Sequence, residues 1–497
     1  MSIAIVGFSS AVKLPGFFGE TVFGAGPISA GDIPLKLLLC GTKTSAGTAT
    51  VDADVVDIFS TTAADTAFGP GSEIAVMCYG ALQTPGVRIS AIAAAEGGSA
   101  AAATATITLT GTWTASGTAI YRIDGVRVAA GVSSTDTLTT AAVAIVAAIN
   151  ALPHLSVTAA NLVGVITLTR KSKGLRGLQG ILFQDITQLP SGMVSTLAGG
   201  VAVTGGGYHF VSGTGADDVT NVLTFIATTQ YDRIACAQND ATNAALWELH
   251  VNTQAGTTIG HLEHLIFASN ASLSAAMSIA QTTLNAERAQ YLWQLNGETI
   301  PSFVAATFAA IRTATEQDDP SAAYDGKVLP GVAPQSQRTD WPSYNTQVSA
   351  IDNSLTPITS DTNGDAKVII SITTKSLTSG SPDYRTFDTC QAVVPDYVRT
   401  DIRLYWETVY NISNPKVNSD PADGEKARRP GVATPTRWNQ AVHGRLLDLE
   451  EKLFITDVDT NLPDSEYNVA GKRIMSVIPC VPSKPQHSIG CSVRQVG

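Results

Sequence analysis

Three histidines near the middle of the chain are the residues whose types best suit chemistry. His250, His261 and His264 follow one another closely, and Glu263 stands between the last two. A zinc enzyme needs two ligands on one face of an element with a carboxylate base nearby, as in HExxH. The spacing here is HLEH, and a glycine-containing turn precedes His261. We therefore expect no metal site; a metal hydrolase built on these histidines is the alternative, and it requires bound zinc.

Other patterns with chemical potential are also weak. Gly199–Gly200 and Gly205–Gly207 are glycine-rich, but no GxxxxGK[ST] or GxGxxG follows a strand there, so we interpret both as linkers. Asp318 and Asp319 fit a solvated helix end better than an acid–base pair. No GxSxG or Cys–His signature is present. The sequence thus predicts no catalytic residue, no cofactor and no enzymatic activity.

Basic residues gather in one part of the C-terminal region. Lys426, Arg428 and Arg429 stand among acidic residues ahead of Pro430–Gly431, as exposed loop charges often do. Thr434 and Pro435 then open a helix, as cap and first residue. Its apolar stripe comprises Trp438, Val442, Leu446, Leu449 and Leu453, and one side of that stripe carries Arg437, Arg445 and Lys452. Two interpretations stay open: a solvated face, or a basic ridge that meets an acidic partner.

Composition narrows the class of protein. The chain has 497 residues, which suggests about three domains, and 44% of them are hydrophobic. Only 15% are charged, which suits a surface largely covered by other copies of the same chain. A secreted, β-rich adhesin could share this composition. The net charge of −11 argues against nucleic-acid binding, because phosphate contacts need a basic footprint.

Cysteine usage and hydropathy bear on the compartment. The six cysteines form no CxxC pair, so we expect reduced, mostly buried thiols made in a cytoplasm: Cys40, Cys78, Cys236, Cys390, Cys480 and Cys491. Met1–Val6 is apolar but has no basic residue before it, so we expect no signal peptide. No apolar run approaches the roughly 18 residues that a membrane span needs. We expect no membrane insertion.

Alternating strands and helices predict an α/β domain made of two separate segments, 31–92 and 204–330. Pro34–Gly41 is a continuous apolar run typical of a buried strand, and Ser72 caps a helix that includes Cys78. The pattern resumes after Gly207 with predicted helices at Asp217–Thr229, Asn243–Gln254, Ser272–Arg288 and Ser302–Thr315, and predicted strands at Tyr231–Ala237, His264–Ala268 and Tyr291–Leu295.

Residues 93–203 predict a small, β-rich α+β domain inserted into this α/β domain. Thr104–Thr110 alternates threonine with apolar residues, and Ile120–Val128 forms a hairpin that turns at Asp124–Gly125. A helix is expected at Leu138–Leu152, ended by Pro153, and strands at Leu155–Ala159 and Val163–Thr169. The small-residue flanks predict flexible linkers.

The remaining sequence predicts a C-terminal domain, 331–483, and an arm at each end, 1–30 and 484–497. The C-terminal domain contains a predicted strand at Asp365–Thr373 and a helix at Val398–Ser413; later strands are expected at Tyr467–Pro479 and Gln486–Val496. Both ends are short-stranded and apolar, and they lack a core of their own. Each arm therefore needs a neighbour on which to lie.

Several stretches, in order along the chain, resemble the Mu-type contractile tail sheath family. Ser10–Glu20 is similar to the family's opening arm, Leu37–Gly41 to its first strand, and Ala64–Ser72 to its FGxGS turn. Tyr231–Ala235 resembles its YDxIA strand. Ile370–Thr374, with Asp383 and Asp388, resembles its IxRxITT motif, although Ser371 stands where the family usually has arginine. Residues 93–203 correspond to the family's variable insertion.

The resemblance implies a tail-sheath fold and a structural subunit that polymerises around a tail tube and contracts to drive it through the host envelope. It implies a helical homo-oligomer in a virion tail, assembled in the host cytoplasm, with tail tube, baseplate and terminator proteins as partners. The insertion would lie outside and the C-terminal domain would face the tube, with Arg437, Arg445 and Lys452 as tube-facing residues. The arms would link subunits through Val12, Leu14, Pro15, Phe17, Phe18, Ile489, Val493 and Val496. A surface adhesin or tail-fibre protein is the alternative.

Overall fold

A computed structural model describes residues 34–335, 338–423, 425–470 and 472–487. These residues fall into two compact units. The large unit comprises Pro34–Tyr397, Leu446–Asn461 and the segment from Cys480 onward; the small unit comprises Val398–Arg445 and Leu462–Pro479. The predicted arm residues Val12 to Phe18 and Ile489 to Val496 lie outside the described residues.

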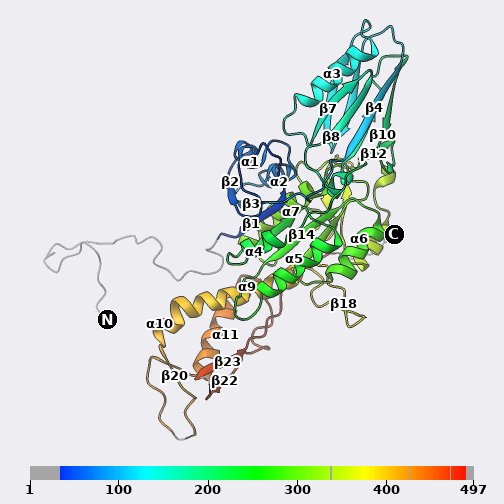
Figure 1. Cartoon of the computed structure of the whole chain (residues 1–497). Coiled ribbons are helices and arrows are strands. Elements are labelled where there is room, and N and C mark those ends of the chain that lie inside the picture. Colours follow the sequence, from blue (N-terminus) through cyan, green and yellow to red (C-terminus); the bar gives the residue numbers. More distant parts are fainter. Residues whose placement is uncertain (1–33, 336–337, 424, 471, 488–497) are drawn as a thin grey trace, which may run out of the picture. The chain divides into compact units, whose positions relative to one another are not determined.

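An eight-stranded sheet forms the centre of the large unit (Figure 1). Its order is β17-β16-β15-β14-β13-β1-β3-β2, with the six inner strands parallel and the two outer strands antiparallel to their neighbours. The bounds are Lys36–Thr42 (β1), Val55–Ile58 (β2), Arg88–Ala94 (β3), Arg233–Cys236 (β13), His264–Ser269 (β14), Ala289–Trp293 (β15), Thr356–Ser360 (β16) and Ala366–Val368 (β17). The predicted α/β architecture is confirmed.

Helices cover both faces of this sheet, which explains its continuous apolar strands. Leu37 and Leu39 of β1 pack in the core shared with α1 (Thr61–Phe68), α2 (Glu73–Ala81) and α7 (Pro301–Asp318). Leu38 packs in the core on the other side. The helical elements on that side are α4 (Thr220–Ile226), α5 (Ala241–Gln254), α6 (Leu273–Met277), the π-helix η3 (Ser278–Leu284) and α8 (Tyr344–Asp352). Ser72 caps α2 by accepting a hydrogen bond from the backbone N–H of Ala75, as predicted.

The inserted domain consists of two sheets and one helix around a single apolar core. One sheet contains β10 (Met193–Ala198), β4 (Thr104–Gly111), β8 (Val165–Arg170) and β7 (Val157–Leu162). The other contains β11 (Ala202–Val203), β12 (Gly207–His209), β9 (Ile181–Asp185), β5 (Gly117–Ile123) and β6 (Val126–Val132). The helix is α3 (Leu138–Asn150), and a short 3-10 turn, η2, spans Leu175–Gln179. The predicted α+β module is confirmed.

The glycine-rich stretch after this core is not the predicted linker. Strands β11 and β12 pair with each other, and β12 pairs with β9 in the five-stranded sheet. Gly207 is needed there because a Cβ atom at this position would lie 2.6 Å from the ring of Phe183. Bridges from Thr104 to Val211 and from Ala101 to Thr214 continue the pairing past the predicted end at residue 203.

The central sheet also crosses the predicted boundary at residue 331. Strands β16 and β17 come from the range assigned to a separate C-terminal domain, yet they pair with β15 in order. The strand predicted at Asp365–Thr373 is shorter than expected: β17 ends at Val368, and Ile372 makes only an isolated bridge to Asp388. A short hairpin follows, with β18 (Leu377–Thr378) and β19 (Ser381–Pro382).

The small unit holds parts of two long helices and two small sheets. Helix α9 (Thr389–Tyr405) begins earlier than predicted, in the large unit, and runs into the π-helix η5 (Trp406–Tyr410) and α10 (Asn411–Ser413). Helix α11 spans Pro435–Glu451, and Thr434 caps it by accepting a hydrogen bond from the N–H of Arg437 at 3.4 Å. The sheets are β20 (Lys416–Val417) with β21 (Val432–Ala433), and β22 (Asp464–Asn468) with β23 (Arg473–Val477).

Candidate functional site

The carboxyl edge of the central parallel sheet is the first place to look for a ligand, because doubly wound sheets bind ligands there. Here the polar side chains at that edge face the inserted domain. Asn239, after β13, accepts a hydrogen bond from the Gln179 amide at 2.8 Å, and Asn270, after β14, donates to the Gln179 carbonyl oxygen at 2.8 Å. Glu298 pairs with Arg122 at 2.8 Å. These groups hold the insert in place.

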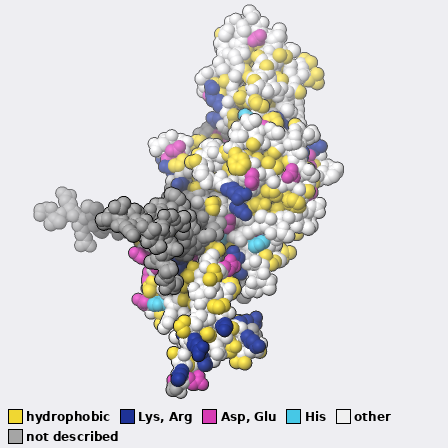
Figure 2. All heavy atoms as spheres, turned by 90° about the vertical axis from the view of Figure 1, so that its left-hand side faces the viewer, with side chains coloured by type: hydrophobic (Ala, Val, Ile, Leu, Met, Phe, Trp, Pro, Cys, Tyr) yellow, Lys and Arg dark blue, Asp and Glu magenta, His cyan; other side chains and the backbone are white. Residues whose placement is uncertain are grey.

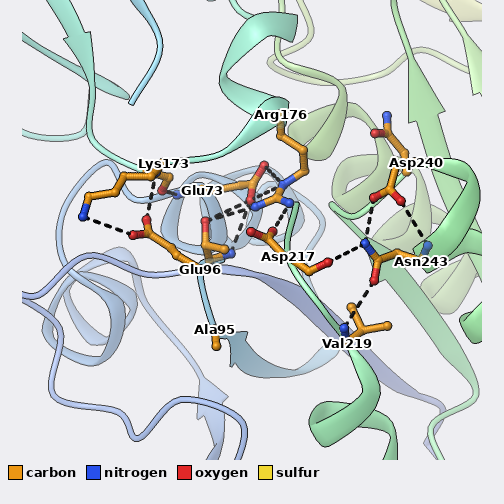
Figure 3. A network of polar contacts seen from close by, with 12 residues as sticks. Glu73, Ala95, Glu96, Lys173, Arg176, Asp217, Val219, Asp240 and Asn243 are labelled. Carbon is orange, nitrogen blue, oxygen red and sulfur yellow. Dashed lines mark hydrogen bonds and ion pairs between the residues drawn. The ribbon is translucent and has the colours of Figure 1, made fainter. Parts of the chain in front are cut away.

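A buried ion network fastens the insert to the central domain (Figure 3). The Arg176 guanidinium in η2 lies 2.9 and 2.8 Å from the two carboxylate oxygens of Glu73 at the start of α2, and it also pairs with Asp217. Burial raises the pKa of Asp217, and nearby Glu73 adds to the rise, while Arg176 opposes it. All three side chains are buried, so each charge depends on the others.

The same network corrects the prediction of flexible flanks. Glu96, in the small-residue segment before the insert, accepts a hydrogen bond from the backbone N–H of Lys173 at 2.8 Å. A Cβ atom at Gly97 would lie 2.5 Å from the carbonyl oxygen of Ala216, so the two chain crossings run close together. The crossings between insert and central domain are therefore packed and paired.

The histidines do not share a site. His250 Nε2 lies 3.4 Å from Glu263 Oε2, whereas His264 Nε2 lies 3.1 Å from Asp396 Oδ2, which also binds Arg288. Burial lowers the pKa of His264 to about 4, and the nearby Arg233 contributes, against the opposing effect of Asp396. Among the described residues no three metal-ligating side chains converge. His250 and His264 therefore face different carboxylates, and the HLEH spacing does not assemble a metal site among the residues that the structure describes.

The predicted tube-facing residues differ in their surroundings. Arg437 donates to the carbonyl oxygens of Arg429 and Val432, both at 2.8 Å, and so ties the preceding loop to the start of α11. Arg445 forms a two-pronged pair with the buried Asp401, at 2.6 and 2.7 Å. Lys452 is exposed and lies one residue beyond the end of α11. Arg437 and Arg445 therefore have structural partners in their own chain, and the role of all three at a tube stays a prediction.

Basic side chains of the loop between β20 and β21 reach solvent. Lys426 and Arg429 are exposed, as is Lys416 in β20, and Arg428 is half-buried beside Glu425. Figure 2 shows dark-blue and magenta side chains over this loop. The same loop carries Asp420, Asp423 and Glu425, so its exposed charges are of both signs.

The hairpin of residues 464–477, formed by β22 and β23, is an exposed element of the small unit. None of the described residues in its two strands is buried. It forms a sheet of two strands, so within the described residues each strand has one edge that faces no other strand. Val469, Met475 and Val477 are 76%, 45% and 70% exposed. An isolated two-stranded hairpin is only marginally stable, and open edges are templates for added strands.

The sequence predicts a strand in this region but does not predict that its residues are exposed. Tyr467–Pro479 was predicted as strand, and the hairpin begins earlier, at Asp464. The signal available in the sequence was the mixture of Val469, Met475 and Val477 with charged residues, without an apolar alternation that would define a buried face.

Side chains or loops contact three other sheet edges in the described part of the chain, those of β7, β10 and β17. The Asn150 side chain donates to the carbonyl oxygen of Ala159 on edge strand β7 and accepts from its N–H, both at 2.9 Å. Gln184 donates to the carbonyl oxygen of Ser195 on edge strand β10 at 3.1 Å. Residues 326–329 pair along the outer edge of β17.

No helix in the described ranges is long and apolar enough to cross a membrane.

Comparisons with known proteins place the chain beside contractile sheaths. It is similar to a sheath tail protein from Desulfitobacterium hafniense, with 12% identity, a TM-score of 0.47, and coverage of 95% of this chain and 96% of that one. A sheath tail protein from Listeria innocua is 11% identical with a TM-score of 0.49, and the match covers 92% of this chain and 95% of that one. The helical sheath of the anti-feeding prophage in its contracted state is 11% identical with a TM-score of 0.48, and the match covers 98% of this chain and 100% of that one. No family model and no curated protein matches the chain.

Proposed function

We propose that this chain is the structural subunit of a contractile tail sheath, which polymerises around a tail tube and contracts to drive the tube through a host envelope. The observation that carries the proposal is the open hairpin of residues 464–477, whose two strands are exposed along their edges and bury none of their described residues. A two-stranded sheet with exposed edges can accept strands from other copies.

The donors in this proposal are the two arms, 1–30 and 484–497. An extended strand added to an exposed edge gains backbone hydrogen bonds and places alternate side chains in pockets. The apolar side chains that would fill those pockets are Val12, Leu14, Pro15, Phe17, Phe18, Ile489, Val493 and Val496. Each copy would lend strands and receive them, and a head-to-tail contact that does not close on itself builds a filament.

The large unit would move as a rigid body during contraction. Its sheet is covered on both faces, and the insert is fastened by the ion network around Arg176. The energy of contraction would then come from changed contacts between copies, while the arms act as hinges that stay attached. In this proposal the insert projects outward and the tube, baseplate and terminator proteins are the partners in a virion tail assembled in the host cytoplasm.

Contact with the tube would involve the C-terminal region, as the predicted roles of Arg437, Arg445 and Lys452 require. The structure adds a distinction within that set: Arg437 and Arg445 already bind groups of their own chain. Lys452, whose ammonium group lies 6.0 Å from the centre of the Phe454 ring, and the loop residues Lys426 and Arg429 are exposed, as contact with an acidic tube surface would require.

Deleting either arm tests the proposal. A chain without residues 1–30, or without residues 484–497, should stay folded and soluble but fail to form tubes, which negative-stain electron microscopy and sedimentation would show. The full-length chain is the positive control, and circular dichroism establishes that each truncated chain is folded. Normal tubes from both truncated chains would overturn the proposed strand exchange.

A further inference from the structure

The described chain ends in a segment, residues 480–487, that lies along the large unit. The N–H of Thr456 donates to the carbonyl oxygen of Val481 at 2.9 Å, and the N–H of Ser483 donates to that of Phe454 at 3.1 Å. Ile455 and Pro482 form an isolated antiparallel bridge between these contacts. Backbone pairing therefore holds the first half of the segment.

A histidine holds the second half. His487 Nδ1 lies 2.6 Å from Asp325 Oδ2, in the loop after α7, and His487 Nε2 lies 2.9 Å from Asp388 Oδ1, just before α9. A neutral imidazole has one N–H donor, and an ionised carboxylate only accepts. Two such contacts at hydrogen-bond distance therefore fit an imidazolium, which donates from both nitrogens.

The charges around this histidine come from three parts of the chain. Burial lowers the pKa of His487, but the hydrogen bonds and charges of Asp325 and Asp388 outweigh burial, and the pKa is raised overall. Burial raises the pKa of Asp388, and Asp325 contributes, while His487 and Lys484 oppose the rise. Tyr324 and Cys390 line the same small pocket, and burial raises the pKa of both. No carboxylate other than these two faces the ring in that pocket, among the residues described.

We propose that His487 is a proton-dependent latch that holds the root of the C-terminal arm against its own chain. With the imidazolium in place, its charge compensates two carboxylates that would otherwise repel each other. A group whose pKa is raised on binding contributes fully below its ordinary pKa, and the contribution is lost as pH rises through the raised value. The segment is thus held in mild acid and released in mild base. The consequence for strand exchange rests on the proposed function: release makes the arm available to a neighbouring copy.

Cys390 reports on the latch. Its side chain is buried beneath the segment, with Sγ 3.8 Å from the carbonyl oxygen of Ser483. Thiol labelling of Cys390, followed by peptide mass spectrometry, therefore measures how often the segment lifts. Comparing His487→Gln with the wild type at each pH cancels the pH dependence of the thiol itself. We expect the variant to label roughly tenfold faster at about pH 6, as for loss of charge-assisted hydrogen bonds, and equally fast at about pH 9.

Three controls make the experiment decisive. Asp325→Asn should shift labelling in the same direction, and His154→Gln, which alters a histidine near Asp65 elsewhere in the large unit, should leave Cys390 unchanged. Cys236, buried in β13, reports on global unfolding; if its labelling rises in His487→Gln, the Asp325→Asn ratio decides instead. A variant-to-wild-type ratio that is the same at both pH values overturns the latch. Because labelling uses the unassembled chain, that result would leave the proposed sheath function standing, and failed assembly would leave the latch standing.

Discussion

The inserted domain and the 464–477 hairpin differ in how their edge strands are covered. In the insert, Asn150 and Gln184 supply amide groups to the edge strands β7 and β10. In the hairpin, Ser465 donates a hydrogen bond to the Asn439 side chain of α11 at 2.6 Å, but none of the described strand residues is buried and Val477 is 70% exposed. Both regions are β-rich. Polar side chains occupy two edges of the insert, whereas the described strands of the hairpin stay exposed, as expected of an edge that accepts another strand.

The largest expected effect is on assembly. Val477→Lys places a charge on the open hairpin and should abolish tube formation, because a lysine at an edge blocks strand addition. Val194→Lys on β10 is the matched control: that side chain is also exposed, at 51%, and it should assemble normally. Sedimentation and electron microscopy measure the outcome, and both variants should unfold within about 0.5 kcal/mol of the wild type. Equal assembly by both variants would remove the distinction between the two regions.

The second effect concerns the closed region. Arg176→Met leaves Glu73 and Asp217 buried without their cation, and we expect it to lower the free energy of unfolding by about 3–5 kcal/mol in urea titrations. Arg445→Met is the counterpart in the small unit. Its partner Asp401 is buried, but Arg445 is itself about one-fifth exposed, so the loss should be smaller. If Arg445→Met lowers the free energy of unfolding more than Arg176→Met does, the ion network at the insert junction is not the stronger of the two.

Much of the closed region could be predicted from the sequence, because its signals are local. The run at Leu37–Leu39 indicates a strand buried on both faces, the alternation at Thr104–Thr110 indicates a half-buried strand, and Ser72 and Thr434 occupy the caps that were predicted. Each signal depends on neighbours within a few residues. The element types followed from them, while the ends of several elements did not.

The missed features depend on distant partners. Arg176 meets Glu73 across 103 residues of sequence, and nothing local distinguishes it from a surface arginine. The helix predicted at Ser272–Arg288 ends at Leu284, where Asn285 adopts a left-handed backbone and binds the N–H groups of Ser376 and Leu377. Arg437 binds carbonyl oxygens, which carry no sequence signature. The basic pattern on α11 was visible, but its partners were not.

Lowering the pH should destabilise the central sheet around β14 without a matching change in the 464–477 hairpin. His264 is buried in β14 with a pKa lowered to about 4, so the unfolded chain binds a proton that the folded chain does not as pH falls below about 6.5. Stability from this group is therefore present near neutral pH and is lost between about pH 6.5 and 4, by about 3 kcal/mol. The free energy of unfolding, measured by urea titration at several pH values in this range, should fall less steeply with decreasing pH in His264→Gln than in the wild type.

Hydrogen exchange completes that comparison. Amides of β14 should lose protection as the pH falls, whereas the 464–477 hairpin, which buries none of its described strand residues, should be weakly protected throughout. His154→Gln controls for removal of any histidine. An unchanged slope in His264→Gln would mean that other groups set the acid response.

The smallest effect tests edge closure itself. Asn150→Ala removes both hydrogen bonds to Ala159 on β7, and we expect a loss of about 1–2 kcal/mol in the free energy of unfolding. It should also open β7 and produce concentration-dependent association in analytical ultracentrifugation, which the exposed α5 variant Asn252→Ala should not. Destabilisation without association would mean that an open edge alone does not recruit strands. In that case the hairpin must owe its role to Val469, Met475 and Val477, and the Val477→Lys result should then be reproduced by any polar side chain at that position.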